Sequence, residues 1–399
     1  MPGFLNRHRA TQLMQEQGLD ALVLAQPESI HYATGAFPGV ATHWRRAGAA
    51  FVVVPADEHA PLAAIVGDLQ ARSFAAQSGI ADVRSHRIWV ETGTYPDADP
   101  TKLARTPRPA QYDLAASLAL LRDMLSERGL LHSRIGLELG FVPAADYPAF
   151  DAIAVDWQDC TRIVERLRSI KAPLEIERLR HAAHYSSAGL SHLVQSIEAG
   201  MDAAAMAEIW KGAAFAEAKR LGHPVPQSAW SYISVAGDGF APGAPAKAGD
   251  LIKIDVGCVV AGYSSDGGRT AVLGPPHPEA VRIHEALHRA FDTGFTMLKP
   301  GTPLADIYRA TALSMWDQGF EAYGRGHFGH GVGASIWSEE WPFISAESDA
   351  ALEPNMVLAF ETPWYIDGLG GFIIEDQVLI TDTGCDVMAP LPRDLLRIS

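Results

Sequence analysis

The feature that most constrains this chain is a set of acidic residues that end or follow apolar strands in its second half. These residues are Asp255 and Asp266 in LIKIDVGCVVAGYSSDGGRT (251–270), Glu361 in MVLAFETPWY and Glu375 in GGFIIEDQVLIT. An isolated carboxylate in an apolar interior is strongly destabilising unless positive charge compensates it. Arg269 is the nearest basic candidate, no other lysine or arginine is expected to face the set, and one arginine cannot pair four carboxylates. The fold must therefore bring positive charge to them from elsewhere.

A pair of divalent cations would supply that charge. Two ions about 3.5–4 Å apart, bridged by carboxylates, use this many acidic ligands, and His330 in GHFGHGVG adds an imidazole. Mn, Co, Fe and Zn all accept carboxylate and imidazole ligands. Taken singly, Asp255 and Asp266 also suit turns and His330 suits a loop, whereas a buried glutamate is rare unless paired. The order and spacing of the whole set therefore carry the metal hypothesis.

Composition limits the remaining classes of function. The formal net charge of -15 and the lack of a basic block argue against nucleic acid as a partner. No apolar run approaches the roughly 20 residues that a membrane helix needs, and the polar N-terminal stretch does not resemble a signal peptide. Cys160, Cys258 and Cys385 lack metal-ligand spacing and leave one cysteine over from any disulfide. We expect a soluble cytoplasmic protein.

The chain is expected to contain two domains, residues 1–160 and residues 161–399. Strand and helix patterns alternate in the first, which predicts an α/β domain with a Pro- and Asp-rich loop at 92–109. The second is expected to be α+β with antiparallel strands. Its predicted helices span 174–198, 203–221, 277–298 and 303–318.

These segments resemble the metallopeptidase family that includes methionine aminopeptidase, aminopeptidase P and prolidase, whose pita-bread fold is shared by creatinase. GLDALVLAQPESIHYATG and LRSIKAPLEIERLRHAA are similar to the N-terminal domain and domain entry of the prolidase and creatinase branch. The resemblance implies an α+β pita-bread catalytic domain preceded by an α/β creatinase-like domain. It also implies a homodimer, in which the loops at 36–46 and 92–109 would reach the substrate site of the partner chain and set the substrate preference.

The resemblance implies roles for individual residues. Asp255 would bind one metal ion, Asp266 and Glu375 would bridge two, and His330 and Glu361 would complete the coordination of the other ion. Glu361 would also shuttle the proton of a metal-bound water. His327, three residues before His330, matches a family histidine that faces the substrate.

The chain departs from the peptidase pattern around these ligands. GHGVGASIWSEEWP has Trp337 or Glu339, depending on how the loop is counted, where the family has a second catalytic histidine. The segment 234–250 lacks another family histidine, and Ile373 replaces an arginine two residues before the last ligand. Trp337 and Trp341 would supply apolar walls. The metal ligands are thus expected to be intact while the substrate-facing part of the site is rebuilt.

Three functions follow as hypotheses. The first is a manganese-dependent dinuclear hydrolase that cleaves Xaa-Pro dipeptides by attack of metal-bound hydroxide on the amide carbonyl; Co, Zn or Fe would also fit. The second is a non-peptidase on the same fold, similar to enzymes that hydrolyse creatine or ectoine or that cleave dimethylsulfoniopropionate. The third is a binding protein without catalysis, which five retained ligands disfavour.

Overall fold

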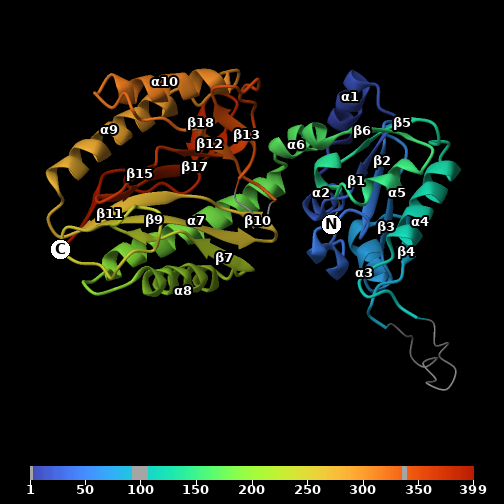
Figure 1. The fold of residues 1–399 in the computed structure, drawn as a ribbon, viewed down its shortest axis with the longest axis horizontal. Helices are drawn as coiled ribbons and strands as arrows, with labels where there is room; N and C mark the ends of the chain where they lie inside the picture. The colour runs from blue at the N-terminus through green and yellow to red at the C-terminus, as the bar shows by residue number, and fades with distance from the viewer. Residues whose placement is uncertain (1–2, 92–106, 335–338) are drawn as a thin grey trace. The chain divides into compact units, whose positions relative to one another are not determined.

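The computed structural model describes residues 3–91, 107–334 and 339–399, and these divide into two compact units, residues 1–168 and residues 169–399. Figure 1 shows a sheet with helices packed against it in each unit. The predicted loop at 92–109 lies outside the described residues except for its last three positions.

The first unit is built on a six-stranded mixed sheet in the order β4-β3-β2-β1-β5-β6. The antiparallel pairs are β1–β2 and β2–β3, and the other neighbours are parallel. The strands are β1 Ala21–Leu24, β2 Phe51–Pro55, β3 Ala63–Gly67, β4 Asp82–His86, β5 Arg134–Leu137 and β6 Asp156–Asp159. The helices are α1 Arg7–Gln17, α2 Pro27–Thr34, η1 Val40–Trp44, α3 Asp68–Ser78, α4 Leu114–Glu127, η2 Leu139–Phe141, α5 Tyr147–Asp151 and α6 Thr161–Ser169.

Apolar side chains cover both faces of this sheet. Along β1, Val23 packs with α4 and α5, while Leu22 packs on the opposite face with α1 and α3. Successive residues of a strand point to opposite faces, so a continuous apolar strand requires cover on both sides. The α/β character expected for this part of the chain is confirmed.

The second unit contains an eleven-stranded sheet whose main path is β10-β9-β11-β17-β14-β12-β13. The path strands are β9 Leu251–Val260, β10 Tyr263–Ser264, β11 Gly268–Leu273, β12 His327–Gly331, β13 Glu340–Ser345, β14 Val357–Glu361 and β17 Ile374–Ile380. The remaining strands are β7 Ser228–Ser231, β8 Ser234–Val235, β15 Trp364–Ile366, β16 Gly370–Phe372, β18 Cys385–Val387 and β19 Leu396–Ile398, with β15 and β16 forming a separate hairpin. The expected α+β class with mainly antiparallel strands is confirmed.

Two helix pairs support the two halves of this sheet, and Figure 1 shows α7 and α8 on one side and α9 and α10 on the other. Ile252 and Ile254 of β9 pack with α7 and α8, whereas Leu358 and Phe360 of β14 pack with α9 and α10. The helices are α7 Pro173–Ser196, α8 Ala203–Leu221, α9 Pro278–Phe295 and α10 Leu304–Trp316. Because alternate residues turn away from these cores, the polar positions of β9 and β14 lie on the other face of the sheet.

Candidate metal centre

Three of the predicted carboxylates lie in one row across the sheet. Gly268 of β11 pairs in register with Asp255 of β9 on one side and with Glu375 of β17 on the other. Glu375 pairs in turn with Glu361 of β14. Directly opposed residues in antiparallel strands project to the same face, so the strand register alone gathers these three side chains.

His330 and Asp266 complete a compact cluster with Glu375. His330 pairs with Ala359, two residues before Glu361, and therefore projects to the face of the carboxylate row. One ligand atom from each of Asp266, His330 and Glu375 lies within 4.8 Å of those of the other two. All three residues are buried, and His330 Nε2 lies 3.5 Å from Asp266 Oδ2. The donor types and their spacing fit a metal ion, so this cluster could hold one.

The His330 ring is oriented for coordination. Its Nδ1 lies 3.0 Å from the carbonyl oxygen of Gly331. A carbonyl can only accept, so Nδ1 carries the hydrogen and the lone pair is left on Nε2. The nitrogen that faces Asp266 is therefore the one able to bind a cation, and the Gly331 carbonyl holds the ring in place.

Glu375 shows that the described residues leave the charge of the cluster only partly compensated. Its Oε2 is buried and has no hydrogen-bond partner among the described residues. Burial, together with the neighbouring charges of Asp266, Glu361 and Asp255, raises the pKa of Glu375 well above its ordinary value. An unpartnered acceptor among like charges is what a cation would stabilise, so the residues present fit a divalent metal ion.

Asp255 has a basic partner that the sequence analysis excluded. The Lys253 ammonium lies 3.2 Å from Asp255 Oδ2 and only 1% of its side chain is exposed. The prediction that no lysine or arginine other than Arg269 faces these carboxylates is therefore wrong. Lys253 stands two residues before Asp255 on β9, and the two-residue period of a strand puts both side chains on one face. That spacing was a readable signal.

Glu361 also has a basic partner. Arg325 Nη2 donates to Glu361 Oε1 at 2.6 Å, and Arg325 Nε donates to the carbonyl oxygen of His327. His327 Nδ1 lies 3.6 Å from the same Glu361 oxygen and accepts from the Gly329 amide. Burial lowers the pKa of His327. Arg325 comes from the loop before β12, and no periodic pattern in the sequence predicted that it would pair with Glu361.

Arg269, the nearest basic candidate in the sequence analysis, serves a different carboxylate. Its Nη2 donates to Asp376 Oδ1 at 2.6 Å and its Nη1 donates to the carbonyl oxygen of Glu375 at 2.6 Å. Asp376 is adjacent to Glu375 and so points to the other face of β17. Arg269 thus binds the backbone of Glu375, a candidate metal ligand, and does not neutralise the Glu375 carboxylate.

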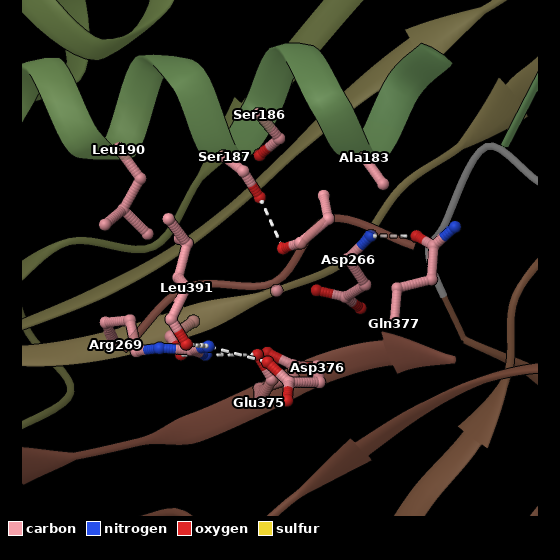
Figure 2. Close-up of a pocket in the computed structure, with 13 residues that line it drawn as sticks. Ala183, Ser186, Ser187, Leu190, Asp266, Arg269, Glu375, Asp376, Gln377 and Leu391 are labelled. Carbon is pink, nitrogen blue, oxygen red and sulfur yellow. Dashed lines mark hydrogen bonds and ion pairs between the residues drawn. The ribbon is translucent and has the colours of Figure 1, made fainter. Parts of the chain in front are cut away.

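Figure 2 shows the small cavity between α7 and these strands, with Arg269 directed at Asp376 and Gln377 directed at Asp266. Gln377 Oε1 accepts from the Asp266 amide at 3.1 Å. The cavity, of about 20 Å³, has room for a water molecule and none for an organic substrate. Asp266 and Glu375 line this cavity together with Arg269 and Gln377.

The positions at which the sequence departs from the peptidase pattern differ in what the structure shows of them. The buried side chain of Ile373 fills the space in front of Gly268, since a Cβ added there would lie 2.8 Å from Ile373 Cδ1. Glu339 is exposed and Trp341 lies in β13. Trp337 lies outside the described residues. An aliphatic group therefore occupies the row between Asp255 and Glu375, and it comes from the position at which the resemblance implies an arginine.

Comparison with known proteins identifies the family of the chain. The model of metallopeptidase family M24 matches residues 177–382, and the creatinase/prolidase N-terminal domain matches residues 7–170. The chain is 30% identical over 237 residues to a Xaa-Pro dipeptidase from Pyrococcus furiosus, covering 59% of this chain and 67% of that protein. It is 27% identical over 293 residues to an ectoine hydrolase from Halomonas elongata, covering 69% of this chain and 73% of the relative.

A solved structure extends the likeness to both units. A Xaa-Pro dipeptidase from Bacillus anthracis superposes with a TM-score of 0.78 at 22% identity, covering 98% of this chain and 99% of that one. At this identity the likeness concerns the fold, which is the expected pita-bread domain preceded by a creatinase-like domain. With a family match over more than half of its length, the chain belongs to metallopeptidase family M24, in the prolidase branch, and is a hydrolase of that family.

Proposed function

We propose that this protein is a metal-dependent hydrolase of a short amide substrate, with Xaa-Pro dipeptides as the first candidates. The observation that carries the proposal is the buried cluster of Asp266, His330 and Glu375, in which Glu375 Oε2 has no partner among the described residues. A bound divalent ion would lower the pKa of a coordinated water and polarise the scissile carbonyl. The name of the P. furiosus relative supports the choice of Xaa-Pro dipeptides.

The residues around the cluster have separate proposed roles. In the family arrangement, Asp255 would bind one ion, His330 and Glu361 another, and Asp266 and Glu375 both. Glu361, held by Arg325 at 2.6 Å, is positioned to accept and return a proton on the substrate face. His327 lies beside it with Nε2 left to carry a hydrogen, and we assign it to a substrate oxygen.

We further propose that the bound ion is manganese, that the protein is cytoplasmic and that it forms a homodimer. Carboxylate-rich sites with one imidazole accept manganese, and the prolidase-branch membership supports the dimer. The three cysteines are all free in the structure, which suits a reducing compartment. Among the described residues, no helix combines the length and the apolar character needed to cross a membrane.

The test is a metal-reconstitution assay. The protein is stripped with a chelator, reloaded separately with Mn²⁺, Co²⁺ or Zn²⁺, and assayed for proline release from a panel of Xaa-Pro dipeptides. We expect metal-dependent release by the wild type and none by Glu375→Gln. A folded, remetallated protein that is inert on the whole panel would overturn the dipeptidase proposal.

A second candidate is hydrolysis of a small C–N substrate that is not a peptide. The specific observation is Ile373, which places an aliphatic group beside the row where peptidases of the branch carry an arginine. The segment 234–250 also contains no histidine. The ectoine hydrolase relative makes ectoine the first compound to try in the same assay, with ring opening followed by NMR. Turnover of ectoine without proline release would favour this candidate.

A further inference from the structure

We propose that this chain holds one divalent ion, at Asp266, His330 and Glu375, and that the Lys253 ammonium takes the place of a second ion at Asp255. The inference rests on the proposed metal-dependent function and concerns how many ions that function uses. It departs from the two-ion expectation stated for the sequence. The structural basis is the buried Lys253–Asp255 pair at 3.2 Å.

Geometry separates the ligand set into two groups. Asp266, His330 and Glu375 converge within 4.8 Å, and Asp255 and Glu361 are outside that cluster. Each of the two outer carboxylates has a basic partner instead, Lys253 for Asp255 and Arg325 for Glu361. The described structure therefore brings one group of donors close enough to share a cation and pairs each of the other two carboxylates with a basic side chain.

The charge balance of this face agrees with a single ion. Four carboxylates face two basic side chains, which leaves an excess of two acidic groups. One divalent ion cancels that remainder. Two divalent ions would leave a buried surplus of two positive charges, which an interior of low dielectric disfavours strongly.

Lys253 is fixed where it would oppose a second ion. Its side chain is 1% exposed, and its ammonium lies 5.3 Å from the centre of the Tyr365 ring in a cation–π contact. A buried ammonium needs its counterion, so a cation bound at Asp255 would remove that partner and add a like charge beside it. Ile373 adds to this effect, because its side chain fills the space in front of Gly268 between Asp255 and Glu375.

The experiment measures the number of ions bound per chain and the magnetic coupling between them. Full-length protein is stripped, dialysed against excess Mn²⁺ and analysed for bound manganese per chain by mass spectrometry, with electron paramagnetic resonance on the same samples. We expect one ion per wild-type chain and the spectrum of an isolated Mn²⁺. Lys253→Met is expected to bind two ions and to show an exchange-coupled pair. The control Lys247→Met alters an exposed lysine of the same unit and should stay at one ion.

A second variant keeps the test decisive if Lys253→Met does not fold. Asp255→Asn should still bind one ion, with affinity within about tenfold of wild type, because Asp255 would act only on the periphery of the site. Glu375→Gln should lose the ion. Two coupled ions in the wild type, or loss of the ion in a folded Asp255→Asn, would overturn the single-ion inference and leave the hydrolase proposal standing. A folded wild type that takes up no ion would instead overturn the proposed function itself.

Discussion

Glu361 and Glu375 lie directly opposite each other on β14 and β17, and both side chains are buried. Like charges that face each other across a strand pair destabilise a sheet. Arg325 relieves Glu361, whereas the described residues leave Glu375 Oε2 without a partner. The pair therefore stores an unfavourable interaction that a bound cation would remove.

Metal removal is expected to destabilise the fold. An ion that binds the folded chain and not the unfolded one adds about 2.7 kcal/mol at a free concentration 100 times its dissociation constant. We expect chelator to lower the midpoint of thermal unfolding and Mn²⁺ to restore it, measured by scanning calorimetry. An unchanged midpoint in a protein shown to lose its metal would contradict this.

Glu375→Gln is expected to have opposite effects on the stability of the metal-free protein and of the manganese-bound protein. In the metal-free protein it removes one of two opposed carboxylates and should raise the free energy of unfolding by up to about 1 kcal/mol. It should also abolish stabilisation by Mn²⁺. Both are measured by urea unfolding with and without the ion.

The neighbouring Asp376→Asn is the matched control for that experiment. Asp376 pairs with Arg269 at 2.6 Å and with Arg393 at 2.7 Å, on the other face of β17. Breaking this buried pair should lower the free energy of unfolding by about 3–5 kcal/mol. Destabilisation of the metal-free protein by both variants would refute the proposed repulsion at Glu375.

Arg325→Met is expected to destabilise the metal-free protein by about 3 kcal/mol, because Glu361 would remain buried without its basic partner. Urea unfolding in the presence of chelator measures the change. Arg309→Met is the control, since Arg309 pairs with Asp306 on the surface and should contribute less than about 1 kcal/mol. Equal effects of the two substitutions would show that the Arg325–Glu361 pair is not a structural element.

His284 is expected to make stability fall in mild acid. Burial lowers the pKa of His284 from 6.5 to about 4, and its Nε2 has no partner among the described residues. The unfolded chain therefore binds more protons than the folded one between these values, so stability is full above pH 6.5 and is lost as pH falls toward 4. The loss attributable to this residue is about 3 kcal/mol.

The measurement compares urea unfolding at pH 7 and pH 4.5. His284→Phe should flatten the difference between the two pH values relative to wild type. His192→Gln, which changes an exposed histidine of α7, should leave the difference unchanged. A wild-type pH dependence that survives in His284→Phe would assign it to other groups.

Much of the fold was readable because its signals are periodic. The helix over 203–221 was predicted with the bounds that α8 has, and the second unit was predicted to be α+β with antiparallel strands, as its sheet shows. The helix over Pro27–Thr34 was not predicted. Pro27 stands at its start, where proline's missing N–H does no harm, and this was the available signal.

The sequence by itself determined which side chains gather at the centre. Asp255, Glu361 and Glu375 each end or interrupt an apolar strand, and strand alternation turns each of them away from the helices that pack beneath. Tertiary structure decided what compensates them. Arg325 reaches Glu361 across 36 positions of the chain, and Ile373 crosses in front of Gly268. The Lys253–Asp255 pair follows from the period of one strand, but the compensation of Glu361 depends on a contact between segments far apart in sequence, about which local periodicity carries no information.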